Sequence, residues 1–225
     1  MIDGTKANGD TFASLTYNAK RNSANEESFF FRNEAAIFSK ETGEFINNIT
    51  MTRLTNLNRI YVLTSRSTAS ASEMIINGLR PSFGDNNIII IGTTTVGKNE
   101  GSFTVVDAPA NSQNQIFTNT DNMNPNHTVG LQPIVFQIFN SAGESDYSEG
   151  FNPDIFVDEL EFTANILPFG DTNEPLLRTA INNITGAVTK SLEKPTTKVE
   201  LLEKVKFEKF HDELYTIPEK DKFDN

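Results

Sequence analysis

Two short, almost entirely apolar runs with a helical pattern between them constrain the fold of this chain most strongly. Residues 59–64 combine β-branched and aromatic side chains between polar flanks, which is typical of a buried strand. The run Ile88-Ile89-Ile90-Ile91-Gly92 is too short for a helix of normal length. Residues 71–80 show helical spacing, and we expect Pro81 and Gly84 to end that helix. This order predicts a βαβ unit whose strands lie parallel in a sheet covered on both faces.

The remaining segments predict further strands and two helices around this unit. Phe is frequent, with 18 copies, and Trp is absent, a bias that suits strands and polar loops better than a helical bundle. Pro133 is expected at the beginning or edge of its strand, because proline cannot donate to a sheet ladder. We expect strands at 11–16, 29–31, 35–38, 102–106 and 131–139, a long loop or irregular hairpin at 108–129, helices at 174–186 and 198–214, and a linker at 187–197.

Composition excludes several classes of function. The formal net charge of −11 argues against a nucleic-acid partner, which needs concentrated Lys and Arg. The chain has no cysteine, so it has neither disulfides nor a thiolate nucleophile or metal ligand. No apolar run approaches the roughly 20 residues that cross a bilayer, and no signal peptide is visible in the polar residues 1–10. Metal-ligand spacings and a phosphate-binding loop are also absent, so we expect no metal and no cofactor.

A serine and a lysine flank the predicted βαβ unit in a way that suggests chemistry. Ser70 lies where the first strand gives way to the helix, so free N–H groups at the helix end would stabilise a developing negative charge there. Lys98 comes after the second strand and lies 28 positions after Ser70. Parallel neighbouring strands place their carboxyl ends at one sheet edge, so we expect the two residues to meet. Lysine could then act as the base that a serine hydroxyl needs as a nucleophile.

This pairing has a requirement and several alternatives. The pKa of Lys98 must fall well below about 10.4, which burial would achieve and an ion pair with Glu100 would oppose. Ser70-x-x-Glu73 is equally a capping box that only begins the helix, and Lys98 beside a glycine is commonly a solvated loop residue. Two histidines offer other bases: His127 lies in a polar loop, and His211 in the predicted C-terminal helix.

Residues 59–98 resemble the C-terminal processing, or tail-specific, serine peptidases. The resemblance depends on Ser67-Thr68-Ala69-Ser70-Ala71-Ser72-Glu73 and on Ile91-Gly92-Thr93-Thr94-Thr95-Val96-Gly97-Lys98, and more loosely covers residues 10–165 in the manner of Bacteroidetes-type members. It implies a ClpP/crotonase-like α/β core with a βαβ unit and a mixed sheet, followed by a helical C-terminal extension. We therefore expect a catalytic part at 1–165 and an extension at 166–225.

The resemblance also implies the roles of individual residues. Ser70 corresponds to the nucleophile, Lys98 to the general base, and the backbone N–H of Ala71 to one donor of the oxyanion hole. Many members carry a glutamine four places after the lysine to orient it, and Ser102 stands at that position here. The Ser-to-Lys separation is a few residues longer than the family pattern, which an extended turn at 83–87 would absorb.

The front of the chain departs from the family pattern. The peptide-binding PDZ domain and the glycine-rich turn that supplies the second oxyanion donor are not recognisable, so we expect a longer parent enzyme and an unpaired sheet edge that favours self-association. The implied function is hydrolysis of protein C-termini or unfolded polypeptides in a periplasm or cell envelope. A non-catalytic peptide-binding or scaffolding domain remains the alternative. A crotonase-like acyl-transfer enzyme is disfavoured because no acyl-CoA signature is visible.

Overall fold

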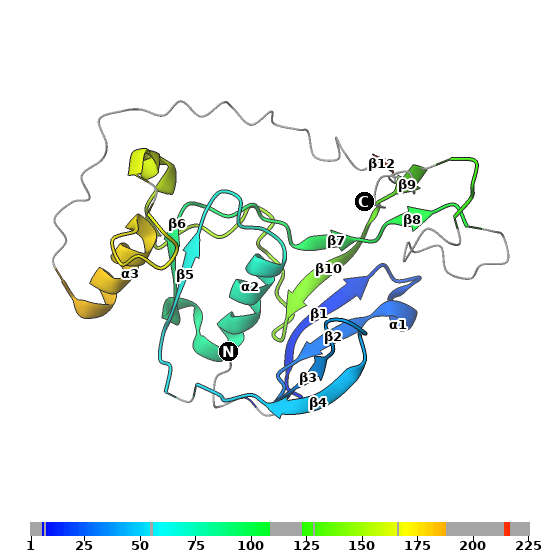
Figure 1. Cartoon of the computed structure of the whole chain (residues 1–225), viewed down its shortest axis with the longest axis horizontal. Coiled ribbons are helices and arrows are strands. Elements are labelled where there is room, and N and C mark those ends of the chain that lie inside the picture. Colours follow the sequence, from blue (N-terminus) through cyan, green and yellow to red (C-terminus); the bar gives the residue numbers. More distant parts are fainter. Residues whose placement is uncertain are drawn as a thin grey trace. The chain divides into compact units, whose positions relative to one another are not determined.

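The computed structural model describes residues 6, 8–54, 56–108, 123–127, 129–165, 167–187 and 214–216. The chain divides into two compact units, the first formed by Met1–Asn99 and Gln137–Val199 and the second by Glu100–Phe136 and Glu200–Asn225 (Figure 1). The fold is mixed α/β, as predicted, with several small sheets and few helices. The predicted division at residue 165 stays a prediction.

The predicted βαβ unit is present in the first unit. Strand β5 (Ile60–Thr64) and strand β6 (Ile88–Gly92) pair in parallel from Ile60 opposite Ile88 to Thr64 opposite Gly92. Helix α2 (Ala71–Phe83) connects them, and β11 (Ile155–Phe156) pairs in parallel with the other side of β6 (Figure 1). The carboxyl ends of β5 and β6 therefore lie side by side, immediately before the segments that carry Ser70 and Lys98.

Apolar side chains cover both faces of this small sheet, as the sequence predicts. On one face Ile88 and Ile90 form a buried cluster with Ile76 and Leu79 of α2. On the other face Ile91 packs against helix α3 (Pro175–Thr185), with Ile89 and Ile155 beside it. Alternate residues of β6 thus point to opposite helices, which explains why this strand is apolar throughout.

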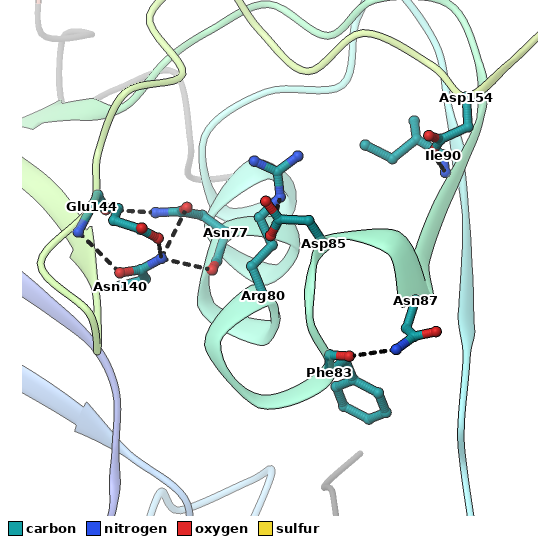
Figure 2. Close-up of polar contacts among 9 residues, drawn as sticks. All are labelled: Asn77, Arg80, Phe83, Asp85, Asn87, Ile90, Asn140, Glu144 and Asp154. Atoms are coloured by element: carbon teal, nitrogen blue, oxygen red, sulfur yellow. Dashed lines mark hydrogen bonds and ion pairs between the residues drawn. The ribbon is translucent and has the colours of Figure 1, made fainter.

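Helix α2 is longer than predicted because it continues through Pro81 to Phe83. Proline has no N–H, so the carbonyl oxygen of Asn77, four residues earlier, loses its helical donor. Asn140 supplies a replacement, since its Nδ2 lies 3.3 Å from that oxygen (Figure 2). The helix then ends at Gly84, with φ of 77°, and the short 3₁₀ helix η1 (Asp85–Asn87) leads into β6.

The rest of the first unit consists of antiparallel strands and short helical turns. Strand β1 (Thr11–Tyr17) lies between β2 (Glu27–Phe30) and β10 (Ile134–Asn140) in the sheet order. The one-turn helix α1 (Asn22–Asn25) and the 3₁₀ helix η2 (Glu159–Asn165) complete it. A separate hairpin pairs β3 (Glu34–Phe38) with β4 (Phe45–Thr50). The sequence did not predict β4, because all six of its residues are exposed and their polarity does not alternate.

Two of the predicted strands are each interrupted in the structure. The prediction at 102–106 becomes β7 (Glu100–Ser102) and β8 (Val105–Val106). The prediction at 131–139 becomes β9 (Val129–Leu131) and β10, with Pro133 in the break, where a missing N–H costs no ladder bond. Strand β12 (Leu214–Thr216) pairs with β9. Most of the predicted loop at 108–129, the linker at 187–197 and the helix at 198–214 lie outside the described residues.

No helix in the described part of the chain has the length and apolar character that a membrane crossing requires.

Candidate active site

Ser70 occupies a strained turn at the beginning of α2. Its φ of 54° and ψ of −114° make it the one non-glycine residue with positive φ among the described residues. Such a conformation costs about 1–3 kcal/mol and persists only when the surrounding structure holds it. The Ser70 side chain faces the N–H of Glu73 in a capping-box arrangement, without a close hydrogen bond to it. Ser70 thus both begins the helix and presents its partly exposed side chain at the helix end.

Glu73 holds this turn in place through four hydrogen bonds, although its side chain is 0% exposed. Its Oε2 accepts the backbone N–H of Ser70 at 2.9 Å and that of Lys98 at 2.8 Å. Its Oε1 accepts the Thr95 hydroxyl at 2.5 Å and the Gly97 N–H at 2.6 Å. One buried carboxylate therefore joins the beginning of α2 to the loop after β6. A buried charge is tolerated when hydrogen bonds of this kind replace its hydration.

Two further backbone contacts hold the loop that carries Lys98. The Val96 N–H donates to the carbonyl oxygen of Thr68, just before the Ser70 turn, at 2.9 Å. Gly97 has φ of +86°, and a Cβ there would lie 2.2 Å from the carbonyl oxygen of Ser148. Only glycine permits this close approach, so Gly97 determines the backbone conformation immediately before Lys98.

Tyr147 and Phe151 support the same loop from the core side. Their rings stack with centroids 4.9 Å apart, and the Phe151 N–H donates to the Thr95 hydroxyl at 2.8 Å. Burial, together with the negative charge of Glu73, raises the pKa of the Tyr147 hydroxyl to about 12. Among the described residues, that buried hydroxyl has no hydrogen-bond partner. The Tyr147 hydroxyl therefore stays protonated at neutral pH, near the negative charge of Glu73.

The structure brings together the backbones of Ser70 and Lys98, but it does not bury the lysine. The Lys98 side chain is exposed, and no described residue of the first unit forms a salt bridge with it. The surrounding side chains of the first unit therefore leave the amine in contact with solvent.

The other predicted site residues occupy separate positions. Ala71 is the first residue of α2, where the helix's own hydrogen-bond ladder does not use the N–H. Ser102 ends β7 in the second unit, so its role toward Lys98 stays a prediction. His127, also in the second unit, contacts Asp107 with Nε2 and Oδ2 3.2 Å apart. His211 lies outside the described residues.

Within the described ranges, no cluster of three or more His, Cys, Asp or Glu side chains could hold a metal ion.

Comparison with solved structures links this fold to the S41 proteases. A Bacteroides fragilis protein assigned to the S41 proteases superposes with a TM-score of 0.58 and 28% sequence identity, over 84% of this chain and 40% of that one. A photosystem II D1 C-terminal processing protease matches at 0.32 and 23% identity over 56% of this chain and 28% of its own. A Streptococcus agalactiae lipoprotein matches at 0.41 and 16% identity, covering 80% and 46%. No protein-family model and no curated protein matches the sequence.

Of these three similarities, only the first has a TM-score above 0.5, and it shows that this chain shares its fold with part of that S41 protease. This chain spans less than half the length of that neighbour. The capping-box pattern of the sequence predicts one of the four hydrogen bonds of Glu73, the bond from the Ser70 N–H. The other three come from residues 22 or more positions away, and no local pattern signals them.

Proposed function

We propose that this chain forms part of a serine endopeptidase that cleaves unfolded polypeptides or protein C-terminal tails with Ser70 as nucleophile and Lys98 as general base. The supporting observation is the shared oxygen of Glu73, to which the N–H groups of both residues donate. Because both donate to this oxygen, the backbone nitrogens of Ser70 and Lys98 lie within about 6 Å of each other. The similarity to an S41 protease supports the same assignment.

In this proposal the neutral amine of Lys98 accepts the proton of the Ser70 hydroxyl while the oxygen attacks the scissile carbonyl carbon. The Ala71 N–H, at the positive end of α2, donates to the oxyanion of the tetrahedral intermediate. The lysine ammonium then gives its proton to the leaving amine as the carbon–nitrogen bond breaks. Water, deprotonated by the same amine, hydrolyses the acyl-enzyme and restores Ser70. Ser102 is the candidate for orienting the amine.

The exposure of Lys98 assigns a further role to the substrate. A polypeptide bound across the beginning of α2 would cover the lysine and remove water from it. Proton transfer from the Ser70 hydroxyl to the amine would then take place out of contact with bulk water.

A non-catalytic peptide-binding or scaffolding domain is the second candidate, and the exposure of Lys98 favours it. The decisive assay follows hydrolysis of unfolded, fluorescently labelled casein by the purified chain and by Ser70→Ala. The proposal predicts hydrolysis by the wild type and its loss in the variant, with unchanged circular dichroism. Equal activity in both proteins would contradict it. Binding without hydrolysis in both would favour the scaffold.

Three further assignments depend on the family resemblance. We propose a periplasmic or cell-envelope location for the full-length protein, a Bacteroidetes-type origin, and self-association through an unpaired sheet edge. Immunoblotting of periplasmic and cytoplasmic fractions of the source cells would test the first, and sedimentation velocity of the purified chain would test the last.

A further inference from the structure

An apolar pocket lies beside α2, away from the residues that form the candidate dyad. Its volume is about 300 Å³, at the small end of the range for ligand sites. Two of its eight lining residues are charged, Arg32 and Glu34, and their opposite charges leave no net charge. The others are apolar: Phe12, Phe30, Phe31, Met51, Ile75 and Leu79.

Buried core residues line the interior of the pocket, whereas the residues at its entrance are exposed to solvent. Phe31 and Leu79 are 5% and 3% exposed, and the ring of Phe12 stands edge-on to Phe31 with centroids 5.5 Å apart. The ring of Phe12 packs directly on α2 at Gly78, which has no side chain. A Cβ at that position would lie 2.5 Å from the ring. Phe30 and Ile75, each 39% exposed, are the apolar residues open to solvent.

Helix α2 connects this pocket with the candidate active site. Ala71, Ile75 and Leu79 recur every four residues, so they lie along one face of the helix. Ile75 is five residues beyond Ser70, which corresponds to about 7–8 Å along the helix axis. An extended polypeptide advances about 3.3 Å per residue. A chain attacked at Ser70 could therefore place a side chain in the pocket two or three residues from the scissile bond.

We infer that this pocket binds a large aliphatic or aromatic side chain of the polypeptide substrate and so determines specificity. The inference depends on the proposed peptidase function, because it assigns the substrate preference of that same site. Leu or Phe displaces water from an apolar wall that Ala would leave partly hydrated. Arg32 and Glu34 cancel in charge, so selection operates through apolar burial. An acidic side chain at the entrance should oppose it.

The test separates binding from cleavage. Fluorescent peptides with Leu or Ala at positions two and three residues from a central bond are titrated against Ser70→Ala and against Ser70→Ala with Ile75→Asp. We expect Ser70→Ala to bind the Leu peptides at least tenfold more tightly, and Ile75→Asp to remove most of that ratio. Because Ile75 is partly exposed, this change should leave the circular dichroism unaltered. Phe30→Ser provides a second probe of the same entrance.

Ile184→Asp is the matched control, since Ile184 on α3 is 62% exposed and outside the pocket. It should leave the Leu-to-Ala ratio unchanged. Two results would overturn the inference. One is a Leu-to-Ala affinity ratio in the folded Ile75→Asp and Phe30→Ser proteins that is as large as in Ser70→Ala alone. The other is no preference for the Leu peptides in Ser70→Ala. Because these measurements use an inactive serine variant, they do not depend on hydrolysis. Failure of the peptidase proposal would appear instead as intact casein in the wild-type assay.

Discussion

Ser70 and Lys98, 28 positions apart in the sequence, donate their backbone N–H groups to the same oxygen, Oε2 of Glu73, at 2.9 and 2.8 Å. The geometry of the candidate site thus depends on Glu73, which is not itself a member of the proposed Ser70–Lys98 dyad. Because the carboxylate is fully buried, its four donors replace the water that it loses. This arrangement sets the relative position of the turn and the loop before any substrate binds.

Replacing Glu73 by glutamine should destabilise the protein strongly despite the similar shape. Glutamine has one acceptor oxygen, so its NH₂ group would face two of the present donors in either orientation. We expect a loss of about 2–4 kcal/mol in the free energy of unfolding. Urea denaturation measures this loss. Glu144→Gln is the control, since exposed Glu144 accepts one side-chain bond, from Asn140 at 2.8 Å, and should cost under about 1 kcal/mol. Similar losses in both variants would contradict the role of Glu73.

Gly97→Ala should lower both stability and activity, because the added Cβ would meet the carbonyl oxygen of Ser148. Gly143→Ala is the matched control, with φ of +79° and no atom within 4 Å of the added Cβ. The control should cost about 1 kcal/mol from its backbone conformation alone. Gly97→Ala should cost at least about 3 kcal/mol and displace Lys98. Thermal denaturation and peptide hydrolysis check the pair, and equal effects would exclude the close contact as the cause.

Pro81 and Asn140 should show energetic coupling. Pro81→Ala restores an N–H for the Asn77 carbonyl, which now depends on Asn140 Nδ2. We therefore expect Asn140→Ala to cost about 1 kcal/mol less in the Pro81→Ala background than in the wild type. Four urea denaturation curves complete this double-mutant cycle. Additivity within about 0.5 kcal/mol would contradict the replacement of the helical bond by Asn140.

Tyr147→Phe should stabilise the protein at neutral pH and change its response to alkali. Its buried hydroxyl has no partner among the described residues, so removing it should stabilise by about 1 kcal/mol. The folded pKa of about 12 exceeds the unfolded value near 10. Between these values the unfolded chain loses the proton first, so the stability that is complete below pH 10 falls as the pH rises to 12.

The phenylalanine variant should therefore lose about 2–3 kcal/mol less than the wild type between pH 10 and pH 12. Urea denaturation at pH 7, 10, 11 and 12 provides the comparison. Parallel pH profiles of the two proteins would show that Tyr147 ionises equally easily in the folded and unfolded chain.

The sequence predicted those features that local periodicity determines. The apolar runs of β5 and β6 and the helical spacing of α2 and α3 correspond to observed elements, because burial on both sheet faces leaves an unmistakable pattern. Pro81 misled the prediction of the helix end. Whether a proline ends a helix depends on whether the freed carbonyl finds another donor, and Asn140 is 63 residues away from that carbonyl.

The candidate site was predictable in part for the same reason. Ser70 and Lys98 follow adjacent parallel strands, so topology alone predicts their proximity. The burial of Glu73 and the exposure of Lys98 are properties of tertiary packing, and a capping-box pattern gives the same letters whether its glutamate is solvated or enclosed. The strand β4 was missed because its exposed, polar sequence carries no periodic signal.

Covalent labelling of Ser70 tests the proposed nucleophile and base most directly. Wild-type protein and Lys98→Met are incubated with diisopropyl fluorophosphate from pH 6 to pH 10, and the modified residue is identified by mass spectrometry. The proposed mechanism predicts phosphorylation at Ser70 in the wild type, with a rate that rises with pH as the amine loses its proton. It also predicts at least a 100-fold slower reaction in the folded Lys98→Met protein. Labelling at another serine, or an equal rate at Ser70 without the lysine, would contradict it.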